Sequence, residues 1–178
     1  MKYPIGIQNF DKIIEDGYVY LDKTHLIYDL VHNGNIYFLC RPRRFGKSLL
    51  VSTLKCYFEG KKELFKGLAI DKLEKERKQY PVFHIDFNGI NFTEAGLLDR
   101  TLEGFVKKQE ALWGKDEFAE GLGSRFASVL KAAHEKTGLR AVVLIDEYDK
   151  PLLDVLDQEL YITINGSNAS WKIGTVRC

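Results

Sequence analysis

Hydrophobic positions follow two patterns along the chain. In some stretches they recur at helical spacing, which predicts long helices over residues 47–59, 97–112 and 118–133. In others they form short, nearly continuous runs, which predict buried strands over residues 36–40, 82–87 and 141–145. Because long helical stretches separate these runs, we expect parallel pairing through right-handed crossovers. The pattern therefore predicts an α/β layered domain with a mainly parallel sheet.

Weaker signals fill the rest of the chain. Residues 1–20 predict an irregular segment with one short helix, another helix is expected after Asp22, and a third near residues 70–79. Residues 159–178 are rich in Asn, Ser and Gly, and predict a small hairpin around Asn165-Gly166 or a disordered tail. We therefore expect one domain over residues 1–158 and a divergent tail over residues 159–178.

Composition narrows the class of protein. With 178 residues, 45% of them hydrophobic and 29% charged, the chain suits one globular domain. The net charge of +1 gives no overall reason to expect nucleic-acid or membrane binding. No apolar run approaches the roughly 18 residues of a membrane span, and the first residues do not lead into a signal-peptide core, so we expect a cytoplasmic protein. The three cysteines lack metal-ligand spacing.

The most informative segment joins the first predicted strand to the helix after it. The loop between them ends in Gly46-Lys47-Ser48, as in a phosphate-binding loop of the Walker A type, where amides and a Lys hold phosphate and a hydroxyl binds Mg²⁺. The first position is Arg41 where the usual motif has Gly, which leaves the curvature of the loop open. The candidate nucleotide-binding residues are Arg43, Arg44, Phe45, Gly46, Lys47, Ser48 and Leu49.

Two carboxylates end the last predicted strand. Asp146 and Glu147 fall at the carboxyl edge of a parallel sheet, where such folds bind ligands. Asp146 is a candidate Mg²⁺ ligand together with Ser48, and Glu147 is the candidate catalytic base for an attacking water. The alternative is that these carboxylates have no function, since charged residues often end buried strands where the chain reaches solvent. The acidic pair and the loop together favour a nucleoside-triphosphate site, whereas each alone is a weak signal. His84 is interpreted as structural.

Four segments resemble one known family. They are Tyr3-Pro-Ile-Gly-Ile-Gln-Asn-Phe10, Gly17-Tyr-Val-Tyr-Leu-Asp-Lys-Thr24, Arg41-Pro-Arg-Arg-Phe-Gly-Lys-Ser48 and Leu144-Ile-Asp-Glu-Tyr-Asp-Lys-Pro151. They are similar to segments of the bacterial AAA-ATPase-like family, and the resemblance covers residues 3–155. An Arg at the first loop position is a feature of that family, so Arg41 does not count against the motif.

The resemblance implies a three-layer P-loop NTPase domain that uses ATP and Mg²⁺. It places Lys47 and Ser48 at phosphate and metal, Asp146 at the metal, and Glu147 as base. Family members usually continue into further strands and a nuclease-like domain of the PD-(D/E)xK type, so we expect this chain to be truncated, with a sheet incomplete at its C-terminal end.

Three functional hypotheses stay open. The first is an ATP-binding domain, an ATPase if it is active. The second is a non-catalytic remnant or a nucleotide-dependent interaction module with a protein partner or a second copy. The third, nucleic-acid binding through Arg41, Arg43 and Arg44, is opposed by the near-zero net charge.

Overall fold

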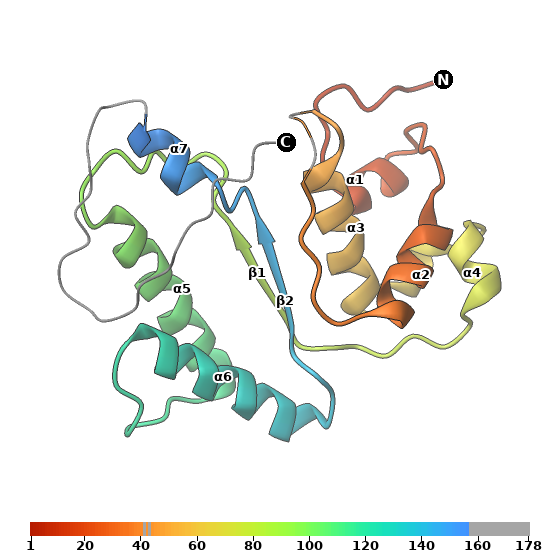
Figure 1. The fold of residues 1–178 in the computed structure, drawn as a ribbon. Coiled ribbons are helices and arrows are strands. Elements are labelled where there is room, and N and C mark those ends of the chain that lie inside the picture. Colours follow the sequence, from red (N-terminus) through yellow and green to blue (C-terminus); the bar gives the residue numbers. More distant parts are fainter. Residues whose placement is uncertain (41, 43, 157–178) are drawn as a thin grey trace.

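The computed structural model describes residues 1–40, 42 and 44–156. The elements, shown in Figure 1, are α1 (Phe10–Glu15), α2 (Thr24–Asn33), α3 (Lys47–Phe58), the 3₁₀ helix η1 (Lys62–Phe65), α4 (Ala69–Leu73), β1 (Val82–Asp86), α5 (Leu97–Trp113), α6 (Leu122–Thr137), β2 (Val142–Asp146) and α7 (Lys150–Leu156). The tail predicted over residues 159–178 lies outside the described residues, as do Arg41 and Arg43.

The described part of the chain contains a two-stranded sheet. Strands β1 and β2 run parallel, in a register that pairs Val82 with Val142 and Asp86 with Asp146. The connection between the strands carries α5 and α6, as parallel pairing requires. The predicted α/β fold with a parallel sheet is therefore confirmed, although the sheet is smaller than expected.

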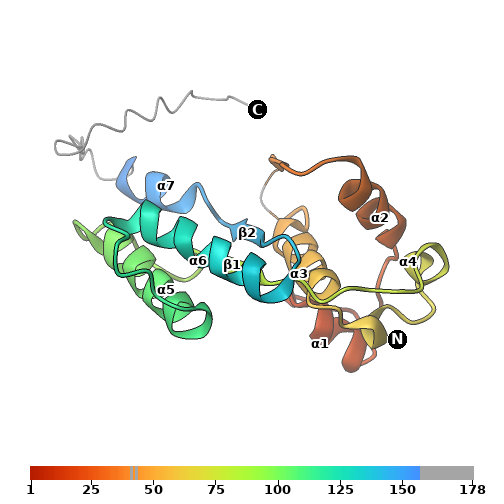
Figure 2. The same cartoon turned by 90° about the horizontal axis from the view of Figure 1, so that it is seen from below.

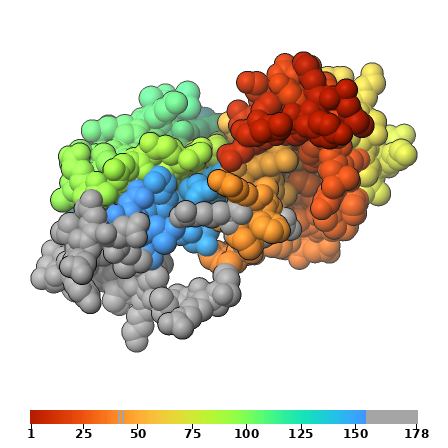
Figure 3. Space-filling model, turned by 90° about the horizontal axis from the view of Figure 1, so that it is seen from above, coloured from red at the N-terminus to blue at the C-terminus, as the bar shows by residue number. Residues whose placement is uncertain are grey.

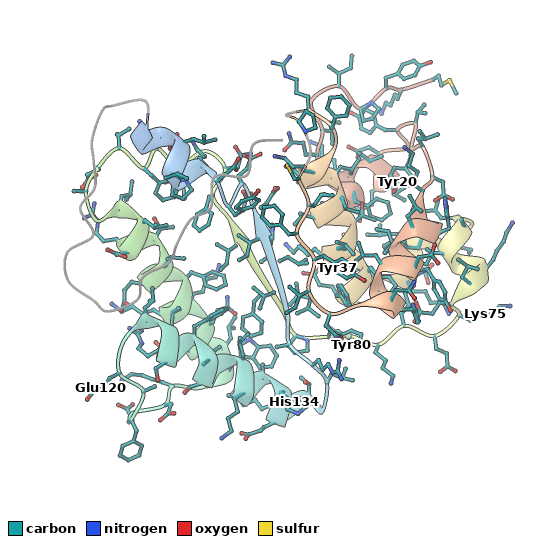
Figure 4. The ribbon with its side chains drawn as sticks, viewed as in Figure 1. Tyr20, Tyr37, Lys75, Tyr80, Glu120 and His134 are labelled. Atoms are coloured by element: carbon teal, nitrogen blue, oxygen red, sulfur yellow. The ribbon has the colours of Figure 1, made fainter. Side chains whose placement is uncertain are left out.

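The prediction of a strand over residues 36–40 is wrong. The segment makes side-chain contacts and does not join the sheet. The Tyr37 hydroxyl, labelled in Figure 4, donates to the Leu30 carbonyl at 2.5 Å, which turns this side chain back toward α2. The Phe38 ring lies 4.9 Å from the Tyr148 ring, just beyond β2. Ile36 is 94% exposed and Phe38 67% exposed, so the apolar run is not buried. Strand propensity depends on such tertiary context.

Helices lie on both sides of the small sheet. Helices α5 and α6 occupy one side of the strands, and α1 to α4 occupy the other (Figures 1 and 2). Because side chains alternate along a strand, Phe83 points into a cluster with Val129 and Ala133 of α6. Leu144 packs on the opposite side, against the cluster that contains Phe10 of α1. The two cores thus form on the two faces of one sheet.

An arginine clamp joins α5 to α6. The Arg125 guanidinium donates to Glu110 through Nε and Nη2 and to Glu103 through Nη1, each at 2.7 Å. These hydrogen bonds lower the pKa of both carboxyl groups. Bidentate contacts of this kind fix geometry as well as charge. The clamp therefore sets how the helix pair that covers β1 is packed.

A second polar network connects the start of α2 to α4. The Asp22 carboxylate accepts hydrogen bonds from the amide and hydroxyl of Thr24 at 2.9 and 2.7 Å, and from the Ala69 amide at 2.7 Å. The buried Thr24 hydroxyl in turn accepts from the Ile70 amide at 3.0 Å. The network thereby joins residues that lie far apart in sequence.

Replacing Asp22 with alanine is expected to lower the free energy of unfolding by about 2 kcal/mol at pH 7, because hydrogen bonds to a charged acceptor contribute about 1.5–3 kcal/mol. Burial alone would raise the pKa of Asp22, but the bonds from Thr24 and Ala69 outweigh it and lower the pKa below the ordinary value. The contribution is therefore present at neutral pH and is lost as pH falls through the lowered pKa. Urea unfolding at neutral and acidic pH measures it.

The matched control is Asp29→Ala on the exposed side of α2. It should change stability by less than about 0.5 kcal/mol at either pH. An Asp22→Ala variant as stable as the Asp29→Ala variant at pH 7 would show that the network does not contribute.

Candidate functional site

Helix α3 begins directly after Gly46, the glycine of the predicted phosphate loop. Gly46 has a φ of 75°, in the left-handed region that glycine adopts readily, and its carbonyl accepts the Leu50 amide at 3.0 Å. Since glycine has no side chain to cap the helix, the amides of the first turn face outward without a cap from this position. Such a helix start is suited to bind an anion.

A cavity of about 370 Å³ lies in front of this helix start. One wall comes from the loop and α3, and consists of Arg44, Gly46, Lys47, Ser48 and Leu49. The facing wall comes from the segment after β2, and consists of Glu147, Lys150, Leu153 and Asp154. Gln8 and Asn88 complete the lining. Figure 3 shows the chain around α3 (orange) and the chain around β2 and α7 (blue) next to one another on one face.

A second cavity of about 180 Å³ lies beside the first and shares Gln8, Ser48 and Asn88 with it. Ser48 and Asp146 both line this cavity, together with Asp86 and His84 of β1. The register of the sheet explains the arrangement, because Asp86 and Asp146 are paired at the carboxyl ends of the two strands. The hydroxyl and the carboxylate proposed for one metal ion thus face a common space.

The acidic pair at the end of β2 has a defined local geometry. Asp146 is only 7% exposed, and its Oδ1 accepts the Glu147 amide at 3.0 Å. The Glu147 carbonyl accepts the Lys150 amide at 3.0 Å, which closes the turn that leads into α7. Asp146 therefore lines the smaller cavity while Glu147 lines the larger one.

Backbone strain coincides with the larger cavity. Among the described residues, Arg44 and Glu147 are the non-glycine residues with a positive φ, at 68° and 53°. One lies on each wall of the cavity. A left-handed conformation costs about 1–3 kcal/mol at such residues, and strained residues cluster at active sites and ligand clamps.

His84 lines the smaller cavity, and its interpretation as a structural residue stays a prediction. Its Nε2 is enclosed and has no hydrogen-bond partner among the described atoms. Burial lowers the pKa of His84, and the positive charge of Lys55 lowers it further. The imidazole is therefore neutral at pH 7. The nearby Cys56 is a free thiol whose pKa burial raises to about 11, so it is not a reactive thiolate.

The structure brings most of the predicted site residues together. Arg44, Gly46, Lys47, Ser48 and Leu49 share the larger cavity with Glu147, and Ser48 shares the smaller one with Asp146. Phe45 is 65% exposed and lines neither cavity. Arg43 lies outside the described residues.

Five residues that line the larger cavity were not predicted from the sequence patterns: Gln8, Asn88, Lys150, Leu153 and Asp154. Gln8 lies in the family-like segment Tyr3–Phe10, which assigns it no role, and Asn88 lies in no motif. The packing of α1 on α3 and the pairing of the strands bring both residues to the site. Lys150 did have a signal, because it follows Asp146 and Glu147 closely in the acidic segment.

Two other kinds of feature are absent from the described part of the chain. It contains no group of three or more His, Cys, Asp or Glu side chains arranged to hold a metal ion. None of its helices combines the length and the apolar character needed to cross a membrane.

Comparison with known proteins identifies a family for this chain. Residues 4–171 match the family described as Predicted AAA-ATPase, and the chain belongs to this family. The match extends beyond residues 3–155, which contain the motifs that carry the resemblance.

The chain is also similar to a curated protein of Azotobacter chroococcum mcd 1, described as an uncharacterized protein in the vnfD 5' region. The two are 42% identical over 156 residues, which cover 87% of this chain and 30% of the relative. The chain thus spans about 30% of the length of that relative. No solved structure matches the chain.

Proposed function

We propose that this chain is a P-loop ATPase domain that binds Mg²⁺-ATP in the 370 Å³ cavity. The observation that carries the proposal is that one cavity is lined both by Gly46, Lys47 and Ser48 at the start of α3 and by Glu147 after β2. Family membership supports the use of a nucleotide. The helices on both sides of the parallel sheet support a three-layer P-loop architecture.

The chemistry of the loop suits a triphosphate. The amides at the start of α3 supply hydrogen bonds to phosphate oxygens, and the helix dipole favours their negative charge. The Lys47 ammonium adds a mobile point charge for the β- and γ-phosphates. We propose that Arg44 and Leu49 also belong to the phosphate-binding loop. Arg43 and Phe45 are included on the basis of the motif alone.

The donor set suits a magnesium ion that arrives with the nucleotide. Ser48 and Asp146 offer one hydroxyl and one buried carboxylate around the smaller cavity. Protein sites for nucleotide-bound Mg²⁺ typically use one or two such ligands and leave the remaining positions to phosphates and water. When bound, the ion would neutralise charge on the phosphates.

Glu147 is the proposed base for hydrolysis. The oxygen of a water molecule would form a bond to the γ-phosphorus as the bond to the bridging oxygen of ADP breaks, and the Glu147 carboxylate would take the proton of the water. The turn that fixes Glu147 between Asp146 and Lys150 would hold the carboxylate at the cavity wall.

Isothermal calorimetry with Mg²⁺-ATP on the wild type and on Lys47→Ala tests the proposal. Lys47→Ala is expected to weaken binding by about 100-fold, because a charge-assisted contact contributes about 1.5–3 kcal/mol. Lys108→Ala on the exposed side of α5 serves as the control and should bind like the wild type. Equal affinity in the wild type and Lys47→Ala would remove Lys47 from the site.

The non-catalytic alternatives differ from an active ATPase because neither of them releases phosphate. An interaction module that depends on nucleotide would bind Mg²⁺-ATP without releasing phosphate, and a remnant would do neither. The exposed apolar side chains Phe38 and Tyr148 next to the site favour the module over the remnant. Thermal melting with and without Mg²⁺-ATP distinguishes the two, since a ligand at 100 times its Kd adds about 2.7 kcal/mol of stability.

A further inference from the structure

Lys150 is a charged group of the larger cavity to which no motif assigns a role. It is the first residue of α7, and it lines the wall that faces the phosphate loop. Lys47 lies in the facing wall of the same cavity. The cavity is therefore bordered by two lysines from separate parts of the chain.

The Lys150 side chain is held by one carboxylate on its own helix. Its Nζ lies 3.0 Å from both Asp154 oxygens, and Asp154 also accepts the Phe92 amide at 3.0 Å. An ammonium group has three donors, so two bonds to Asp154 leave a donor for another acceptor. The Lys150 side chain is only 27% exposed and that of Asp154 only 19% exposed, so the pair is partly screened from water. Asp154 thereby holds the Lys150 ammonium in place.

The position of Lys150 relative to the proposed base is also fixed. The Lys150 amide donates to the Glu147 carbonyl at 3.0 Å, so the two residues belong to one turn. If Glu147 is the base, a phosphate group attacked by water would lie on the side of the cavity where Lys150 is found. Negative charge on the terminal phosphate would attract the ammonium and compete with Asp154 for it.

We propose that Lys150 contacts the terminal phosphate of the nucleotide and makes the site selective for a triphosphate over a diphosphate. The proposal rests on the proposed function. A diphosphate bound at the start of α3 would contact Lys47 but would lack the phosphate that extends toward α7. Asp154 holds the ammonium in place until the triphosphate arrives.

The test is calorimetry with Mg²⁺-ADP and with a non-hydrolysable ATP analogue. Lys150→Met keeps the approximate length of the side chain and removes the charge. It is expected to weaken binding of the triphosphate analogue by about tenfold or more and to change the affinity for ADP by less than about twofold. Lys150→Arg should recover part of the loss, and Lys131→Met on the exposed face of α6 should behave like the wild type.

A double-mutant cycle with Asp154→Asn separates selectivity from packing. The side-chain amide that Asp154→Asn introduces retains an acceptor for the Phe92 amide and removes the charge that competes for Lys150. Asp154→Asn is therefore expected to favour the triphosphate over ADP by about threefold, and the gain should vanish in the double variant with Lys150→Met. Thermal melting of each variant with ADP checks that the site is folded.

The outcomes separate this proposal from the proposed function. If the wild type binds neither nucleotide, both are wrong. If the wild type and Lys150→Met bind ADP and the triphosphate analogue with the same ratio of affinities, only the role of Lys150 is wrong. An equal loss of affinity for both nucleotides in Lys150→Met would also show that Lys150 does not make the site selective.

Discussion

Glu147→Gln is expected to lower the rate of ATP hydrolysis by about 100-fold or more, because a positioned general base contributes roughly 10²–10⁴ to the rate. The substitution keeps the size of the side chain and the turn between Asp146 and Lys150, but the amide cannot take a proton from water. Affinity for Mg²⁺-ATP should change by less than about threefold, since the phosphate contacts at the start of α3 remain. Phosphate release under single-turnover conditions, with protein in excess, measures the rate.

Glu120→Gln supplies the control for this substitution. Glu120, labelled in Figure 4, lies on the exposed loop before α6 and lines neither cavity. The same change of charge there should leave the rate unaltered. A Glu147→Gln protein that binds Mg²⁺-ATP and releases phosphate at the wild-type rate would exclude Glu147 as the base, while leaving the binding site itself in place.

Phe83→Ala is expected to lower the free energy of unfolding by about 3–5 kcal/mol, the cost typical of removing a fully buried phenylalanine. Phe83 has no exposed surface, and its ring centroid lies 6.1 Å from that of Trp113 and 6.0 Å from that of Phe126. Truncation leaves a cavity between β1 and the α5–α6 pair. Since whole domains are stable by about 5–15 kcal/mol, the effect is a large share of the total. Urea unfolding followed by circular dichroism measures it.

Phe118→Ala removes the same atoms from a position that is 95% exposed. It should change stability by less than about 0.5 kcal/mol. The pair of variants therefore distinguishes burial from residue type. If both variants unfold at the same urea concentration, the cluster around Phe83 does not stabilise the fold.

The long elements could be predicted from local patterns. The helix expected over residues 47–59 is α3, and the runs at residues 82–87 and 141–145 correspond to β1 and β2. In each case the signal is the spacing of apolar residues within the element. The run at residues 36–40 had an equally clear signal but depends on partners elsewhere: Tyr37 bonds to the Leu30 carbonyl, and Phe38 contacts Tyr148. No local pattern shows where such side chains will find contacts.

The same distinction applies to the candidate site. Lys47, Ser48, Asp146 and Glu147 could be named because each lies in a short motif whose chemistry requires those residue types. Their meeting around two adjacent cavities depends on the register of β1 and β2 and on the packing of α3 beside β2, which are properties of the whole fold. Gln8 reaches the cavities from the N-terminal segment through such packing, and the family-like segment that contains it assigns it no role.

The long connection between the two strands also suggests an order in which the molecule folds. The whole α5–α6 pair lies between β1 and β2 in the sequence. Pairing of the two strands therefore requires closure of a long loop before any hydrogen bond of the sheet can form. The two helices are joined by a short connection and can associate earlier from local contacts. We expect the end of β2 to reach α3 only in the last stage of folding. A nucleotide that contacts both elements would therefore stabilise the contacts that form last in folding.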